Sequence, residues 1–329
     1  MEPATTTIDP VPSPTTSAAT TTTTTTTTLP KGTQSPLNGL YVLDETSVER
    51  RVIAVKIDNH AEARPQSGVE QADAMIELMA EGVTRFIALS LQTDIDYLGP
   101  NRSVRPTDPT LVRPLNATLV ISGGQDWIKS IVSSVGVPLN GEIPPASFRR
   151  SHRSAPHNLY VSTLLHRNLA TRRGYSDEPM QQRWFEWGEL QGTEFATEVT
   201  LNWTPGLVVT WKYEEGRYVR YLGQNTQNWT DEIRETIEPM AYDTLIVIMA
   251  EMFWQGAPSG AGSAVPVMTT IGSGVAQVFS GGKVTTGTWQ RRTNNDPFTL
   301  HTDSGEEMLV PPGQLWVNIF PRDRAVDWD

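Results

Sequence analysis

The chain has 329 residues, 38% of them hydrophobic and 19% charged, so it is long enough for two domains with buried cores. Its formal net charge of -11 argues against broad nucleic-acid binding, because phosphate recognition needs a basic surface, and does not favour adsorption to anionic membranes. The absence of cysteine excludes disulfides, thiol catalysis and cysteine-ligated zinc.

Residues 1–36 differ in composition from the rest of the chain. They are mostly Thr, Ser, Pro and Ala, with an unbroken Thr run at residues 20–28. Such a segment cannot bury enough apolar surface to offset the entropy of ordering, so we expect a disordered tether of the kind found in exported proteins. No apolar run approaches 18 residues, and no signal peptide is recognisable. We therefore expect membrane attachment only through an anchoring segment upstream of residue 1.

Residues 37–190 have the pattern of an α/β domain, with helices on a mixed sheet. Apolar runs predict strands, and amphipathic segments predict helices. The strands are expected at Val52–Ile57, Val83–Leu91 and Ala117–Ile121, and the helices at Gln125–Val135 and Leu159–Leu169. Asn158 or Ser162 would cap the second helix. Asp73–Glu81 fits a strand or a helix, and either assignment places Asp73, Glu77 and Glu81 on one face.

Residues 191–329 have the pattern of a mainly β domain. Ser280-Gly281-Gly282-Lys283 predicts a tight hairpin turn, and turn signals recur about every ten residues. Trp residues here are expected to pack in the core. The expected strands are Thr197–Trp203, Leu207–Tyr213, Tyr218–Leu222, Thr244–Ala250, Ala276–Phe279, Lys283–Trp289 and Leu315–Phe320.

Polar side chains gather at several points of the first half. Asp58, Asn59 and His60 follow an apolar strand, and two arginines lie on the Pro/Gly-rich loop at residues 93–109. Guanidinium groups suit bidentate capture of carboxylate or phosphate. The expected ligand-binding residues are Asn59, Arg64, Asp73, Arg85, Arg102, Arg105 and Asn158. Two interpretations stay open: an internal salt-bridge network, or a network that also lines a ligand site.

Asp58, Glu77 and His157 are candidates for catalysis, with a carboxylate as base and His157 as acid–base partner. The alternative, which we favour, is that His157 has a structural role as a capping or hydrogen-bonded residue. His60 could join Asp58 in a metal or proton-transfer pair, but one such pair is a weak signal, so we predict neither a metal nor a cofactor. Asp94 and Asp96 are expected in a solvated loop. The sequence has no nucleotide, dinucleotide or zincin motif.

Several ordered motifs resemble those of the DUF3048 family over residues 37–321. Those of the first half are Pro36–Leu40, Val55–His60, Ala63–Gly68, Gln71–Asp73, Glu81–Phe86, Gly99–Pro106 and Ala155–Tyr160. Those of the second half are Ser280–Lys283, Gly287–Trp289 and Pro312–Trp316. The resemblance implies an α/β N-terminal domain, a β-rich C-terminal domain and often a lipid anchor outside the cytoplasm. It implies no activity, and the single Gly at Glu81-Gly82, where relatives often have two, predicts a shorter turn.

Three functional hypotheses follow. The first is a binding module of the cell envelope, outside the cytoplasm, that holds an anionic small molecule or cell-wall fragment through Arg64, Arg102 and Arg105. The second is an envelope hydrolase or transferase in which Asp58 or Glu77 acts as base and the arginines stabilise developing charge. The third is a scaffold for envelope protein complexes, which an exposed apolar patch on the second half would favour.

Overall fold

The computed structural model describes residue 1, residues 32–260 and residues 262–329. Most of the tether expected at residues 1–36 lies outside these residues. Residues 32–36, however, belong to the fold: β1 (Thr33–Gln34) pairs with β2 (Tyr41–Val42), and Ser35 is fully buried. The folded part therefore begins before residue 37, where we expected it to start.

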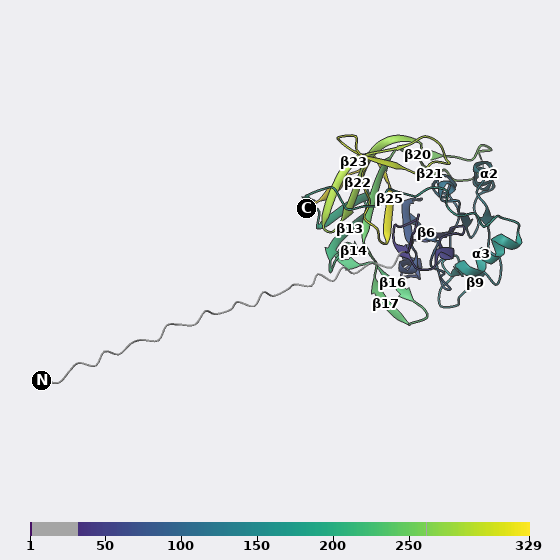
Figure 1. Cartoon of the computed structure of the whole chain (residues 1–329). Helices are drawn as coiled ribbons and strands as arrows, with labels where there is room; N and C mark the ends of the chain where they lie inside the picture. Colours follow the sequence, from purple (N-terminus) through teal and green to yellow (C-terminus); the bar gives the residue numbers. More distant parts are fainter. Residues whose placement is uncertain (2–31, 261) are drawn as a thin grey trace. The chain divides into compact units, whose positions relative to one another are not determined.

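An 11-stranded mixed sheet takes strands from both halves of the chain (Figure 1). Where the halves meet, a strand of the second half lies parallel to one of the first, with Asn318 opposite Glu77. The strands follow the order β11 (Glu194–Phe195), β23 (Lys283–Arg291), β22 (Gly272–Ser280), β19 (Thr244–Ala250), β25 (Leu315–Pro321), β5 (Ala74–Met79), β6 (Thr84–Ser90), β3 (Ile53–Ile57), β7 (Thr118–Val120) and β8 (Leu139–Asn140), with β24 (Thr299–Thr302) beside β23.

The central strands are buried on both faces. Every residue of β3, β5, β6 and β25 is buried, which is why their sequences are nearly continuous apolar runs. Ile76 contributes to one core cluster and the adjacent Met75 to the other. Both clusters contain residues of both halves, so residue 190 does not divide the molecule into two separate cores.

A six-stranded antiparallel sheet packs on one face of the large sheet. Its strands are β15 (Asn225–Thr226), β14 (Arg217–Leu222), β13 (Leu207–Glu214), β12 (Glu198–Thr204) and β26 (Val326–Trp328), with β18 (Ala241–Tyr242) beside β14. Along β12, buried and half-buried residues alternate, so one face meets the core and the other is accessible to water. Trp203, Trp211 and Trp316 are fully buried in this core, which confirms the expected role of Trp in packing.

The α-helices of the described residues are α1 (Asp108–Val112), α2 (Asp126–Val135) and α3 (Thr163–Arg172). Ile128 and Val132, one helical turn apart, anchor α2 in the core on the other face of the large sheet. Short 3-10 turns occur at Glu45–Ser47, Ala61–Ala63, Val69–Gln71 and Arg113–Leu115. No helix in the described part of the chain is long and apolar enough to cross a membrane.

The expected helix at Leu159–Leu169 begins later than predicted. Leu159–Val161 forms strand β10, paired with β9 (Ser147–Arg149), because these three apolar residues are buried and find a partner strand. Ser162 then caps α3 by accepting a hydrogen bond from the Leu165 amide, so Ser162, and not Asn158, is the cap. The ambiguous segment at residues 73–81 is a strand, since β5 pairs with β6 and β25.

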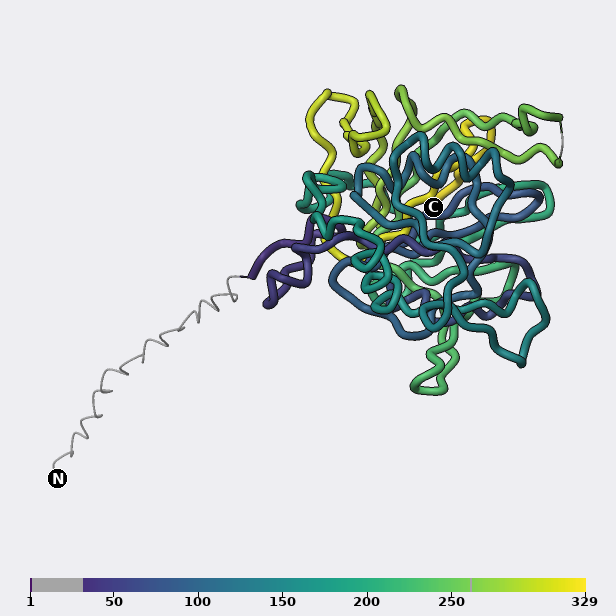
Figure 2. Tube along the Cα trace, turned by 90° about the vertical axis from the view of Figure 1, so that its right-hand side faces the viewer, coloured from purple at the N-terminus to yellow at the C-terminus, as the bar shows by residue number. Residues whose placement is uncertain are grey.

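Small hairpins complete the fold. The predicted turn at Gly281 and Gly282 joins β22 to β23, and both glycines have positive φ, as a two-residue hairpin loop requires. Two other hairpins project from the molecule in Figure 2, one at the lower edge and one at the upper right. The lower hairpin is β16 (Asn228–Asp231) with β17 (Thr236–Pro239), and β16 also pairs with β4 (Gln66–Ser67). The upper hairpin is β20 (Met252–Gln255) with β21 (Val265–Met268).

Candidate functional site

Asp58 is the centre of a polar group at the end of β3. Its backbone N–H donates to the Pro100 carbonyl (2.9 Å), and its carboxylate is almost completely buried. Oδ2 lies 2.7 Å from Nδ1 of His157 and 3.2 Å from Nε of Arg102, although the Arg102 N–H is not aligned for a hydrogen bond. Oδ1 accepts the backbone N–H of His60 (3.1 Å). Asp58, Arg102 and His157, predicted from separate motifs, therefore meet.

The other nitrogen of His157 faces the surface. Nε2 lies 3.2 Å from Oε2 of Glu62, whose side chain is 73% exposed. The His60 ring stacks on the His157 ring, with centroids 4.9 Å apart and an angle of 16° between the planes. The short 3-10 turn at Ala61–Ala63 brings His60 and Glu62 to the same point, since the His60 side chain caps this turn. We did not predict Glu62 as a site residue from the sequence. Its position two residues after His60 was the only sequence feature that could have indicated it.

A second group of charges lies beside Asp58 and is internally paired. Lys56 and Asp108, both with fully buried side chains, form a 2.7 Å ion pair, and burial lowers the pKa of Lys56 to about 8. Arg105 forms two hydrogen bonds with the Glu81 carboxylate (2.6 and 2.7 Å). Burial raises the pKa of Glu81, but Arg105 outweighs this and lowers it overall. Arg85 lies 3.7 Å from Glu81, and burial lowers the pKa of Arg85 to about 10.

Glu77 belongs to a buried network that joins the two halves of the chain. Both of its oxygens accept hydrogen bonds from Arg220, each at 2.7 Å, and neither side chain is exposed. Trp316 Nε1 (3.0 Å) and Thr84 Oγ1 (2.6 Å) also donate to this carboxylate. Because every partner is a donor held inside the core, Glu77 stabilises the fold and is not placed for proton transfer to a substrate.

Arg64 is held by this network at the edge of a groove. Its Nε and Nη2 donate to Oδ1 (3.0 Å) and the backbone oxygen (2.8 Å) of Asn59. The same Oδ1 accepts hydrogen bonds from Gln66 and Gln227, while Nδ2 of Asn59 donates to Thr84. Burial lowers the pKa of Arg64. A hollow of about 500 Å³ next to Arg64 is lined by Arg64, Pro65, Leu222, Asn225, Thr226, Gln227, Asn228 and Ile237.

A second hollow of about 360 Å³ shares Arg64 and Leu222 with the first and continues along Pro205–Val208. We call the two together the Arg64 groove. Within the described residues, no carboxylate lies within ion-pair distance of Arg64, in contrast to Arg85, Arg102 and Arg105. Glu77 and Asp58 act on Arg64 only from beyond ion-pair distance, so the guanidinium is oriented but has no direct ion-pair partner among the described residues.

Asp73 and Asn158 lie in other surroundings. Asp73 accepts hydrogen bonds from the Leu91 amide (2.6 Å) and the Thr93 hydroxyl (2.7 Å), and burial raises its pKa. Asn158 accepts a hydrogen bond from Arg149 (2.7 Å) beside strand β9. Asp73, Glu77 and Glu81 have different partners, and adjacent members are about 13 Å apart along an extended strand. The three carboxylates therefore do not form one acidic site; each belongs to a separate hydrogen-bond network.

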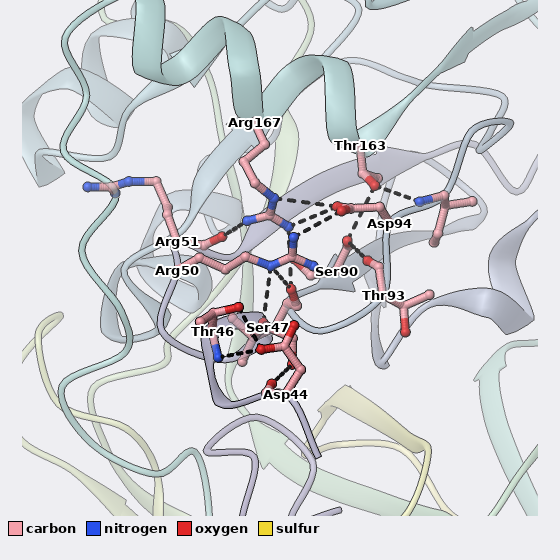
Figure 3. A network of polar contacts seen from close by, with 12 residues as sticks. Asp44, Thr46, Ser47, Arg50, Arg51, Ser90, Thr93, Asp94, Thr163 and Arg167 are labelled. Atoms are coloured by element: carbon pink, nitrogen blue, oxygen red, sulfur yellow. Dashed lines mark hydrogen bonds and ion pairs between the residues drawn. The ribbon is translucent and has the colours of Figure 1, made fainter. Parts of the chain in front are cut away.

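Asp94 and Asp96 are exposed residues of a loop, as expected, and Asp94 also forms ion pairs. Figure 3 shows the guanidinium groups of Arg50 and Arg167 both directed at the Asp94 carboxylate. The nitrogen–oxygen distances are 2.9 Å from Arg50 and 3.3 Å from Arg167. Arg167 also donates to the backbone oxygen of Arg51, whose side chain points away from this group. The network fixes the loop to helix α3, which carries Arg167.

The comparison with known proteins identifies the family. The pattern described as "Protein of unknown function (DUF3048) N-terminal domain" matches residues 37–176, and the corresponding C-terminal domain matches residues 199–317. The chain belongs to the DUF3048 family. It is 25% identical over 300 residues to a Bacillus subtilis (strain 168) protein named "Putative lipoprotein YerB", covering 88% of this chain and 87% of that protein. The crystal structure of YerB from Bacillus subtilis matches with a TM-score of 0.76 and 24% identity, over 90% of this chain and 99% of the other. The resemblance predicted from the sequence motifs is thereby confirmed.

Proposed function

We propose that this chain is an extracytoplasmic binding module of the cell envelope that holds an anionic ligand, such as a cell-wall fragment, in the Arg64 groove. The observation that carries the proposal is the charge state of the groove: Arg64 lines both hollows and has no carboxylate partner among the described residues. A half-buried guanidinium without a direct ion-pair partner is favourable for binding a carboxylate or phosphate.

The position of Arg64 is fixed before a ligand arrives. Two of its nitrogens are bound to Asn59, and Asn59 is in turn held by Thr84, Gln66 and Gln227. A side chain that is already ordered loses less conformational entropy on binding, so more of the interaction energy appears as affinity. Arg102 and Arg105, which we expected in the same role, would have to exchange Asp58 and Glu81 for the ligand.

The groove combines polar and apolar surface. The amide side chains of Asn225 and Asn228 lie beside Leu222 and Ile237, while the buried Gln227 amide is already bound to Asn59, Gln66 and Arg220. Amides suit hydroxyl and peptide groups, while the apolar side chains suit the faces of sugar rings or small peptide side chains. An anionic glycan or peptide fragment matches this surface better than a bare inorganic ion. The likeness to a protein named as a lipoprotein, together with the Thr/Pro-rich residues 1–36, supports attachment outside the cytoplasm.

The test is binding of soluble muropeptides, which carry free carboxylates, measured by isothermal titration calorimetry. Arg64→Gln should weaken binding about 10- to 100-fold, because a hydrogen bond to a charged group contributes about 1.5–3 kcal/mol. Arg234→Gln is the matched control, since that side chain is 80% exposed and lies outside the groove. Equal affinity of the Arg64→Gln variant and the wild type would refute the proposal.

A second candidate function is an envelope hydrolase or transferase. The 2.7 Å contact between Asp58 and His157 favours it, because a buried carboxylate that orients an imidazole leaves the second nitrogen available for proton transfer. Its test is turnover of glycan, phosphodiester and peptide substrates by the wild type and by His157→Gln. Turnover that disappears in this variant, with Arg64→Gln still active, would favour the enzyme over the binding module.

A further inference from the structure

The surface end of the Asp58–His157 pair has the composition of a metal site. His60, Glu62 and His157 each offer one ligand atom, and these atoms lie within 4.8 Å of one another. Two imidazoles and one carboxylate are a ligand set that first-row divalent ions, Zn²⁺ in particular, accept. The set leaves further coordination positions for water or an anionic ligand.

The hydrogen-bond arrangement of His157 supports a cation at this point. If the Nδ1 hydrogen is donated to Asp58, Nε2 of the neutral ring presents a lone pair to Glu62 Oε2, 3.2 Å away. Two acceptors at this distance repel unless something positive lies between them: a proton on Nε2 or a metal ion. Ligand atoms about 2.0–2.1 Å from a tetrahedral ion are about 3.3 Å apart, which the separation of Nε2 and Oε2 matches.

The surrounding residues provide the support that metal sites use. Asp58 is buried and lies 2.7 Å from Nδ1 of His157, the carboxylate–histidine arrangement that fixes the orientation of a metal-binding ring. Arg102 offsets part of the Asp58 charge. His60 is exposed, and its side chain accepts one 3.3 Å hydrogen bond from the Glu62 amide and stacks on the His157 ring. A small rotation of this exposed ring brings a ring nitrogen toward the ion.

We propose that His60, Glu62 and His157 form a divalent transition-metal site, with Asp58 as the positioning residue for His157. His60 and Glu62 lie at the turn that follows β3, His157 lies just before β10, and the site does not include Arg64. The inference therefore stands independently of the anion-binding proposal: one can fail while the other holds.

The experiment is a Zn²⁺ titration of the full chain, freed of any affinity tag and of bound metal, against a chromophoric chelator. We expect one ion per chain with an affinity in the micromolar range or tighter. His60→Ala and Glu62→Gln, both at exposed positions and thus tolerated by the fold, should each weaken binding at least about tenfold. Asp58→Asn should weaken it about 10- to 100-fold, and this variant must first be shown to be folded by circular dichroism.

His301→Ala is the matched control, because His301 lies on β24, separated from β3 in the large sheet by β23, β22, β19, β25, β5 and β6. A second readout is the visible absorption of bound Co²⁺, which reports a His/carboxylate ligand set and should disappear in Glu62→Gln. Absence of binding by the wild type overturns the proposal. So does Zn²⁺ binding that His60→Ala and Glu62→Gln leave unchanged, because the ion would then be held elsewhere on the surface.

Discussion

The Glu77–Arg220 pair offers the most direct test of how the two halves are held together. We consider Arg220→Met, which keeps much of the side-chain volume but removes the charge. The variant loses two charge-assisted hydrogen bonds to Glu77 and one to Gln227. Hydrogen bonds to charged groups contribute about 1.5–3 kcal/mol each, so the gross loss from the three bonds is about 4.5–9 kcal/mol.

Part of this loss is offset, because the variant no longer has the desolvation cost of burying the Arg220 guanidinium. Arg220 is fully buried, with its charge over the rings of Phe86, Trp211 and Trp316 at 4.9–5.4 Å. Met retains the apolar contacts but leaves Glu77 as an uncompensated charge in the core. Breaking a buried pair in this way costs about 3–5 kcal/mol, and we expect this decrease in the free energy of unfolding.

The assay is urea denaturation followed by tryptophan fluorescence, which Trp211 and Trp316 report from beside the pair. Glu77→Gln should be similarly destabilising, and the double variant should be no worse than the poorer single variant, because no charge then remains buried without a partner. Arg234→Met, at an 80% exposed side chain, should change stability by less than about 0.5 kcal/mol. A loss below about 1 kcal/mol in Arg220→Met, or additive effects in the double variant, would refute the reasoning.

Two further predictions concern pH. Burial lowers the pKa of His166 to about 4 from the ordinary 6.5, so between these values the unfolded chain binds more protons and stability falls as the pH falls. Between pH 7 and pH 4, the free energy of unfolding measured by urea denaturation should fall by up to about 3 kcal/mol more in the wild type than in His166→Gln. An equal decrease in both proteins would exclude His166 as the cause. The pKa of Lys56 is lowered to about 8 from 10.5, so this group alone makes stability rise with pH across that range. From pH 8 to pH 10, the free energy of unfolding of the wild type should rise by at most about 3 kcal/mol relative to that of the double variant Lys56→Met/Asp108→Asn. Identical pH profiles of the two proteins would contradict this prediction.

Local features of the fold could be predicted because they depend on local sequence. The fully buried β3 and β6 appear as apolar runs, and the two glycines at 281–282 specify the hairpin. Leu159–Val161 was assigned to the wrong element because three apolar residues before a helix look like its first turn. Only pairing with β9, ten residues earlier in the chain, makes them a strand.

The candidate site could be predicted less completely. The residue types at Asp58, Arg102 and His157 indicated a shared site, and they do meet. Which arginines are neutralised could not be read from the sequence, because Glu81 and Arg220 reach their partners across 24 and 143 residues. Arg64 differs from Arg105 only in what tertiary folding places beside it.

The large sheet also implies that residues 32–190 cannot keep their structure alone. β5 pairs with β25 along Ala74–Leu78, and removing the second half would leave β5 as an exposed edge strand with two apolar faces. Glu77 would lose Arg220 and Trp316 together. We therefore expect residues 32–190 to aggregate or remain unfolded by circular dichroism and size-exclusion chromatography, whereas co-expression with residues 191–329 should restore a soluble complex. A monomeric fragment 32–190 with cooperative unfolding would show instead that the shared sheet is an interface between two independent domains.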